Sequence, residues 1–221
     1  MTIRENLTKL QRELPAGCTL IAVSKTQPFE KIQEAYNCGQ RAFGENRAQE
    51  LASKYKVLPK DVAWHMIGHL QTNKVKYIAP FAALIHSVDS LKLLEEINRH
   101  GLKLQRVIPC LLQIHIAEEE TKFGFSSDEA LELVSSAAWI NLKNIQVKGL
   151  MGMATFTENV ERVRREFRNL KGLFDKLKSQ KLPPSVTMEE LSMGMSNDYR
   201  IAVEEGSTMV RIGTAIFVPR Q

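Results

Sequence analysis

Short apolar segments alternate with helical patterns along almost the whole of this 221-residue chain, and this alternation limits its fold more than any other feature. Eight segments have the length and apolar content of buried strands: 20–25, 41–44, 63–67, 84–88, 107–116, 147–151, 190–193 and 208–212. Helical patterns occupy 28–36, 47–56, 90–100, 127–138, 160–179 and 198–204, and another, 3–14, precedes the first strand. Strands that alternate with helices form parallel sheets, so we predict an α/β protein.

Eight such units in 221 residues fit a closed (β/α)8 barrel of the TIM type, near the lower size limit of that fold, with an extra N-terminal helix. An open, doubly wound sheet is the alternative, but no GxGxxG motif follows the first strand. No Pro-, Gly- or Ser-rich linker interrupts the chain. We therefore predict one domain over residues 1–221.

The formal net charge is +5, which suits either an anionic ligand or nucleic acid. The densest basic stretch, 161–181, carries apolar residues at helical spacing: Val163, Phe167, Leu170, Phe174 and Leu177. That spacing predicts an amphipathic helix with a solvated basic face, and no nucleic-acid motif accompanies it. We therefore expect no nucleic-acid partner.

We predict the cellular compartment from the N-terminal segment, the length of the apolar runs and the cysteines. The N-terminus has no apolar core of a signal peptide, and no apolar run is long enough to span a membrane. Cys18, Cys38 and Cys110 share no CxxC spacing. We expect free, buried thiols in a reducing cytoplasm, and no membrane partner.

In such a barrel, chemistry takes place where strands end, and the ends of strands seven and eight commonly form a phosphate site. Ser196 or Asn197 can cap the helix that follows strand seven, whose free N–H groups attract an anion. Gly194 and Gly213 let backbone approach a ligand, and Thr214 adds a hydroxyl group. Each loop alone is explained equally well as a cap or a turn, but the two together favour a phosphate.

Two basic residues end the first and last strands, which are neighbours in a closed barrel. A lysine at a strand end is usually solvated, but Lys25 in a partly desolvated barrel mouth would have a lowered pKa and could form a Schiff base. Arg211 would then lie close to whatever Lys25 holds. The alternative for Arg211 is an ion pair with Glu205 or Glu45.

Histidines and methionines near the strand ends are weaker signals. His65 and His69 are four residues apart, but strand periodicity and Gly68 argue against a helical metal site, so we interpret both as core or loop histidines. The methionines that we expect to pack the barrel mouth are Met151, Met153, Met193 and Met195.

At these positions the sequence resembles the pyridoxal phosphate homeostasis protein family. The motifs that carry the resemblance are Ala22–Lys25, Phe43–Asn46, Trp64–Lys74, Ser87–Asp89, Leu191–Asp198 and Val210–Phe217. They span nearly the whole chain and keep their order, and the length and basic balance resemble the cyanobacterial members. One departure follows Phe217, where Val218 stands in place of the family's frequent glycine.

The resemblance implies a fold-type III barrel, like the N-terminal domain of alanine racemase, that binds pyridoxal 5′-phosphate. The residues it assigns to the cofactor are Lys25, Asn46, Met195, Ser196, Arg211, Gly213 and Thr214. In this assignment Lys25 forms the Schiff base, Arg211 faces the pyridine nitrogen, and Asn46 lies near the ring. The phosphate is held by Ser196, Gly213 and Thr214, with the backbone near Met195.

The family is associated with vitamin B6 and amino-acid balance, and no robust activity defines it. An arginine does not protonate the ring nitrogen, which leaves a poorer electron sink, although the racemases use the same arrangement. Few residues follow strand eight, whereas those racemases carry a second domain that supplies a base. We therefore expect a monomer that buffers or delivers the cofactor to apo-enzymes. The alternatives are a weakly active racemase, a Schiff-base aldolase on a sugar phosphate, and a nucleic-acid or protein-binding module.

Overall fold

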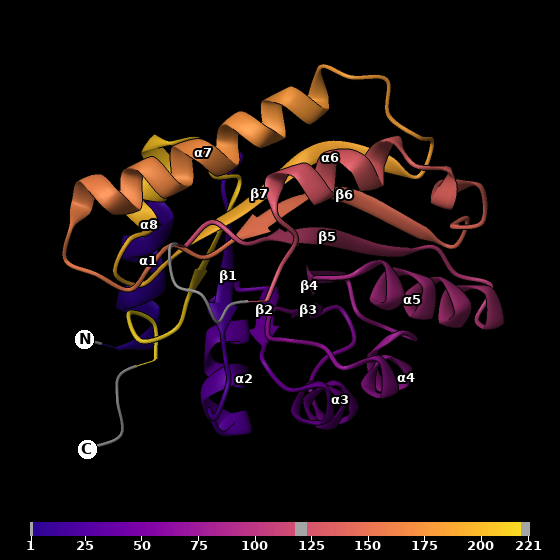
Figure 1. Cartoon of the computed structure of the whole chain (residues 1–221). Coiled ribbons are helices and arrows are strands. Elements are labelled where there is room, and N and C mark those ends of the chain that lie inside the picture. The colour runs from indigo at the N-terminus through magenta and orange to yellow at the C-terminus, as the bar shows by residue number, and fades with distance from the viewer. Residues whose placement is uncertain (1, 118–122, 218–221) are drawn as a thin grey trace.

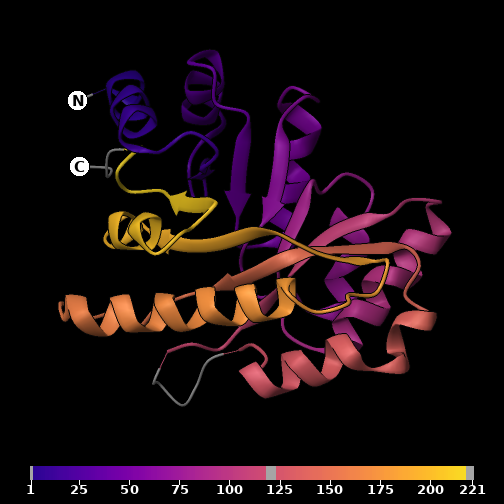
Figure 2. The ribbon, with the colours of Figure 1, turned by 90° about the horizontal axis from the view of Figure 1, so that it is seen from above.

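The computed structural model describes residues 2–117 and 123–217. Within them, eight strands pair in parallel in chain order, and β1 also pairs with β8, which closes the barrel (Figure 1; Figure 2). The strands are β1 (Thr19–Val23), β2 (Ala42–Glu45), β3 (Ala63–Met66), β4 (Leu84–Val88), β5 (Ile108–Ile114), β6 (Ile145–Gly152), β7 (Val186–Met195) and β8 (Met209–Ile212). The predicted (β/α)8 barrel is confirmed. The departure at Val218 lies outside the described residues.

Helices return the chain between the strands, after the predicted N-terminal helix α1 (Ile3–Glu13). They are α2 (Phe29–Asn37), α3 (Ala48–Val57), α4 (Val75–Ile78), α5 (Leu91–Lys103), α6 (Ser127–Ser135), α7 (Val160–Lys178) and α8 (Tyr199–Glu204), with 3₁₀ turns η1 (Thr72–Lys74) and η2 (Ala137–Ile140). The sequence predicted no helix between β3 and β4. There the crossover consists of η1 and α4, which are too short to produce a visible helical period.

Strands β6 and β7 are longer than their apolar patterns predict. Their first halves carry charged residues, and Lys148 on β6 lies 3.8 Å from Glu189 on β7 across their outer face. Because those halves are buried on one face only, the continuous apolar run that marks a buried strand is missing. Strand β1 is shorter than predicted, and Lys25 lies in the turn that follows it.

Helix α7 packs along β6 and β7 on the outside of the barrel (Figure 1). Its five predicted core residues are all buried, which confirms the amphipathic pattern. On its basic face, Arg164 pairs with Glu204 at 2.6 Å and with Glu205 at 3.0 Å, and Arg168 pairs with Glu205. Part of the positive charge of this helix, which had suggested nucleic-acid binding, is therefore neutralised by ion pairs within the fold.

The three cysteines are free, as predicted. Only Cys110 is buried, whereas Cys18 and Cys38 are half-buried, so the expectation of three buried thiols is wrong. Cys110 lies on the fully enclosed strand β5, but Cys18 precedes β1 and Cys38 ends α2, at positions that solvent reaches. None of the helices in the described part of the chain is both long and apolar enough to cross a membrane.

Candidate functional site

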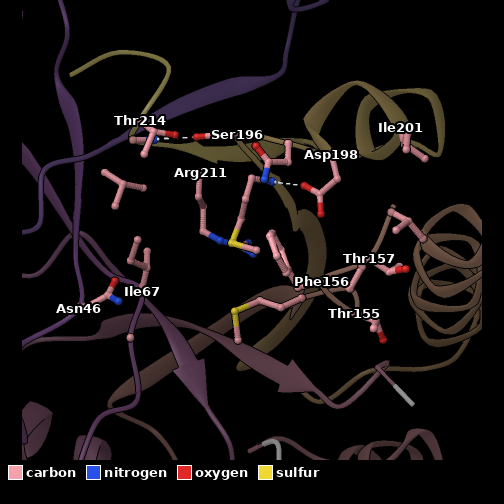
Figure 3. A pocket seen from close by; sticks show the side chains of 18 of the residues that line it. Asn46, Ile67, Thr155, Phe156, Thr157, Ser196, Asp198, Ile201, Arg211 and Thr214 are labelled. Carbon is pink, nitrogen blue, oxygen red and sulfur yellow. Dashed lines mark hydrogen bonds between the residues drawn. The ribbon is translucent and has the colours of Figure 1, made fainter. Parts of the chain in front are cut away.

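A cavity of about 930 Å³ opens at the carboxyl ends of the strands (Figure 3). The residues that the sequence assigned to a cofactor all line it: Lys25, Asn46, Met195, Ser196, Arg211, Gly213 and Thr214. They come from four places in the barrel, after β1, after β2, at the end of β7 and on or after β8. Closure of the barrel through the β1–β8 pair brings the first and last of these groups into one cavity.

Lys25 reaches the cavity from the turn that follows β1. Its side chain is exposed, so the expected partial desolvation is not found. The reason is that β1 ends at Val23, which places Lys25 beyond the last ladder hydrogen bond, from the N–H of Ser24 to the carbonyl of Gly44. No hydrogen bond or ion pair joins its ammonium group to the described residues. The amine is therefore available to a ligand.

Arg211 is the buried cation of the cavity (Figure 3). It donates from Nη1 to Oγ of Ser192, at 2.6 Å, and from Nη2 to the carbonyl oxygen of Gly152, at 3.0 Å. Burial lowers its pKa to about 10, and the nearby charge of Asp198 opposes that shift. The guanidinium is therefore still protonated at neutral pH.

The alternative ion pair for Arg211 is wrong. Glu205 pairs with Arg164 and Arg168 at the outer surface, and Glu45 pairs with Lys54. Both carboxylates pair with other cations, so the guanidinium has no carboxylate hydrogen bond among the described residues.

A line of buried polar groups runs from Arg211 across the barrel interior. Oγ of Ser192 lies 2.9 Å from Nδ1 of His86, and Nε2 of His86 lies 2.9 Å from Nδ1 of His65. A guanidinium can only donate, so Ser192 accepts from it and keeps both a second lone pair and its own proton for His86. Each neutral imidazole carries one N–H and one acceptor nitrogen, so His86 connects Ser192 to His65. Burial lowers the pKa of His65 to about 4 and the pKa of His86 well below its ordinary value, so both rings are neutral at neutral pH.

The interpretation of His65 and His69 as core or loop histidines is confirmed, because His65 is buried on β3 and His69 lies in the loop after β3. The contact between His65 and His86 was not predicted, because no local pattern links residues on different strands. His69 lines the cavity, with Nδ1 3.0 Å from Oδ2 of Asp89 and its ring stacked on Phe123. The described residues hold no group of three or more His, Cys, Asp or Glu side chains that could bind a metal ion.

At the end of β7, Oγ of Ser196 accepts the backbone N–H of Gly213 at 3.3 Å, which ties the β7 and β8 loops together (Figure 3). The hydroxyl proton of Ser196 is left for another acceptor, and Thr214 adds a second hydroxyl beside it. Backbone and hydroxyl donors are the groups that hold phosphates, so this end of the cavity suits an anion.

Two expectations for these loops are wrong. Neither Ser196 nor Asn197 caps α8, because Asp198 occupies the N-cap position and its carboxylate instead accepts the N–H of Met195 at 2.5 Å. Gly194, at φ +93°, does not open backbone to a ligand. A Cβ there would lie 2.6 Å from the Cβ of Ala202, so this glycine lets α8 pack against β7.

A second wall of the cavity was not predicted. The loop after β6 contributes Thr155, Phe156 and Thr157, and Phe156 is 84% exposed (Figure 3). This loop has no motif, so no sequence signal marks it. Of the methionines, Met153 and Met195 line the cavity as expected, whereas the other two are buried below it.

The fold and site together define a (β/α)8-barrel protein with a cavity, lined by Lys25 and Arg211, at the carboxyl ends of its strands. The family model described as "Alanine racemase, N-terminal domain" matches residues 1–221. A pyridoxal phosphate homeostasis protein of Aquifex aeolicus is 44% identical over 203 residues, which cover 91% of this chain and 87% of the relative. The chain belongs to the alanine racemase N-terminal domain family and, within it, to the pyridoxal phosphate homeostasis proteins.

Solved structures agree. PipY of Synechococcus elongatus without PLP superposes with a TM-score of 0.89 at 37% identity, covering 98% of this chain and 100% of that one. PipY with PLP bound gives a TM-score of 0.85 at 36% identity and the same coverage. An alanine racemase of Clostridium difficile shares the fold alone, with a TM-score of 0.74 at 16% identity, 99% of this chain and 56% of that one.

Proposed function

We propose that this protein binds pyridoxal 5′-phosphate in the cavity and takes part in the intracellular homeostasis of that cofactor. The observation that carries the proposal is the convergence of a free primary amine, Lys25, and a buried guanidinium, Arg211, on one cavity with a pair of hydroxyl groups. PipY, a structural relative over 98% of this chain, has been solved with PLP bound.

The donor set fits the three polar parts of the cofactor. Ser196 and Thr214, with the backbone at Met195 and Gly213, would hold the phosphate. Arg211 would donate to the pyridine nitrogen, and Asn46 would lie near the ring. Lys25 offers the amine for the aldehyde. A sugar phosphate could use the same phosphate donors, but it has no aromatic nitrogen for Arg211 to face, so this set favours the pyridine.

Pyridoxal 5′-phosphate supplies an aldehyde that condenses with primary amines with loss of water. Arg211 sets the electronic character of the site, because its pKa of about 10 keeps it protonated and it does not give that proton to a pyridine nitrogen. A ring in this site therefore withdraws electrons weakly, which disfavours carbanion chemistry. The bonds to Ser192 and Gly152 hold the guanidinium in place.

We propose that the protein holds and releases the cofactor rather than catalysing with it. Next to Phe156 and Thr157 the cavity wall carries one carboxylate, Glu158, at an exposed position, and the one imidazole among the described lining residues, His69, is bonded to Asp89. Phe156 on the same loop is exposed, which suits contact with an apo-enzyme during transfer. The protein would act as a monomer in the cytoplasm, and its three free thiols suit a reducing compartment. A weakly active racemase remains the second candidate because of the shared fold.

The first test is the absorption spectrum of the protein mixed with cofactor. Wild type should develop a visible band that borohydride abolishes, and mass spectrometry should place the reduced adduct on Lys25. Lys25→Ala should lose the band, whereas Lys92→Ala, which changes an exposed lysine on α5, should keep it. A wild type without a band would overturn cofactor binding.

The second test separates delivery from catalysis. Loaded protein should activate an apo-transaminase faster than an equal concentration of free cofactor does. Activation no faster than that would refute delivery while leaving binding intact. Turnover of L- or D-alanine by the loaded protein would instead support the racemase.

A further inference from the structure

Lys54, on α3, is a buried lysine that does not line the candidate cavity and that the proposed chemistry does not use. Its side chain is 4% exposed. Nζ donates at 2.7 Å to each of three acceptors: the carbonyl oxygen of Ser24, Oε1 of Glu45 and Oε1 of Glu50. An ammonium group has three N–H bonds, so Lys54 is fully satisfied. It therefore has no lone pair with which to attack a ligand.

All three acceptors of Lys54 belong to, or are hydrogen-bonded to, the turn that carries Lys25. Lys54 holds the carbonyl of Ser24, the residue before Lys25, and Oγ of Ser24 donates to Glu45 at 2.5 Å. On the other side, Glu50 accepts the backbone N–H of Thr26 at 2.8 Å. The residues on both sides of Lys25 are therefore tied to one buried cluster, while the side chain of Lys25 itself has no bond to the described residues.

The backbone of this turn needs such support. Thr26 has φ +61°, a left-handed conformation that is unfavourable for a β-branched residue and persists only where the surroundings impose it.

Burial of the charged groups in this cluster is energetically costly. Glu45 is fully buried, and its Oε2 has no hydrogen-bond partner among the described residues. Apolar side chains of similar volume would usually stabilise a fold as well as a buried ion pair does. Stability alone does not explain the cluster, whereas the geometry of the turn does.

We propose that Lys54 is a positioning residue: with Glu45 and Glu50 it fixes the turn at Ser24 and Thr26, and so presents the amine of Lys25 to the cavity. This role rests on the proposed function of Lys25. The cluster lies outside the cavity, so it should affect the covalent step and leave non-covalent binding of the ring and phosphate unchanged.

The experiment compares wild type with Lys54→Met and with Glu50→Ala. The second variant removes the acceptor of the Thr26 N–H and one of the three acceptors of Lys54, on a side chain that is 25% exposed, and is available if Lys54→Met does not fold. Arg106→Met is the control, because Arg106 is a half-buried cation that also donates to backbone carbonyls, those of Ala79 and Ala82, but lines no part of the cavity.

Three readouts are taken. Hydrogen exchange of a peptide that contains residues 24–27, in protein without cofactor, reports on the turn. The rate of adduct formation with pyridoxal 5′-phosphate reports on presentation of Lys25. The affinity for pyridoxine 5′-phosphate, which carries an alcohol in place of the aldehyde, reports on the rest of the site.

We expect faster exchange and adduct formation slowed about tenfold or more in Lys54→Met, because a misplaced nucleophile loses its orientation advantage. Glu50→Ala should change both in the same direction by less, and Arg106→Met should change neither. Affinity for pyridoxine 5′-phosphate should stay at the wild-type value. Unchanged adduct rates in both cluster variants, or a loss of pyridoxine 5′-phosphate affinity parallel to the rate, would overturn the positioning role. A wild type that binds pyridoxine 5′-phosphate but forms no adduct would instead overturn the proposed role of Lys25, and the positioning role with it.

Discussion

Arg211 on β8 donates to Oγ of Ser192 on β7 at 2.6 Å, and this bond joins the cavity to the two histidines in the barrel interior. Ser192 is fully buried and has a guanidinium on one side and Nδ1 of His86 on the other. Ser192 therefore connects the guanidinium of Arg211 to the pair of histidines, and its loss would remove a partner from both neighbours.

Replacement of that hydroxyl should destabilise the protein. Ser192→Ala leaves Nη1 of Arg211 and Nδ1 of His86 without their buried partner, which costs about 1–3 kcal/mol of unfolding free energy. Denaturant unfolding measures the change. Ser127→Ala, at an exposed position of α6, is the control and should stay within about 0.5 kcal/mol of wild type. Equal stability of the two variants would mean that the hydrogen bonds of Ser192 contribute nothing to the free energy of unfolding.

Stability should fall on acidification because of His65. Burial lowers its pKa from 6.5 to about 4, so below pH 6.5 the unfolded chain binds a proton that the folded protein rejects. The stabilisation is complete above pH 6.5 and is lost as pH falls toward 4, by about 2 kcal/mol at pH 5. His65→Gln should remove this part of the pH dependence between pH 7 and 5. Urea unfolding at several pH values checks it, and parallel curves for wild type and variant would contradict it.

A methyl group at Gly68 should disturb the site. A Cβ there would lie 2.5 Å from the backbone oxygen of Asn46, so the loop after β2 or the loop after β3 must move. Gly68→Ala should lower stability by about 1–3 kcal/mol and weaken binding of pyridoxine 5′-phosphate. Gly172→Ala is the control, because it meets no atom within 4 Å on α7 and should stabilise the helix by about 0.5–1 kcal/mol. Titration calorimetry and thermal unfolding separate the two effects.

The phosphate assignment predicts separate losses of affinity. Ser196→Ala and Thr214→Val each remove a hydroxyl from one end of the cavity, and a hydrogen bond to a charged group is worth about 1.5–3 kcal/mol, or roughly a 10- to 100-fold rise in Kd. Thr157→Val, on the opposite wall, should leave the Kd for pyridoxine 5′-phosphate unchanged. An equal loss in all three variants would place the phosphate elsewhere.

The sequence predicted most of the barrel because its signals are local. A buried parallel strand is a short apolar run, and an amphipathic helix repeats its apolar face within one element, as α7 does. The elements that the sequence did not predict were missed because their local signals are weak. The crossover of η1 and α4 is too short to show a helical period, and the first halves of β6 and β7 are buried on one face only.

The alternation of strands and helices follows from local patterns in the sequence, and these patterns also place all seven candidate residues at strand ends, where the fold collects them. The contacts of each side chain depend on the tertiary structure. Lys25 is exposed because β1 ends two residues before it, and Arg211 bonds to Ser192 instead of a carboxylate. The cluster of Lys54 and the pair of His65 and His86 join residues on different elements. Hydrogen bonds of this kind depend on distances of about 3 Å between atoms far apart in the chain, and only barrel closure and packing set such distances.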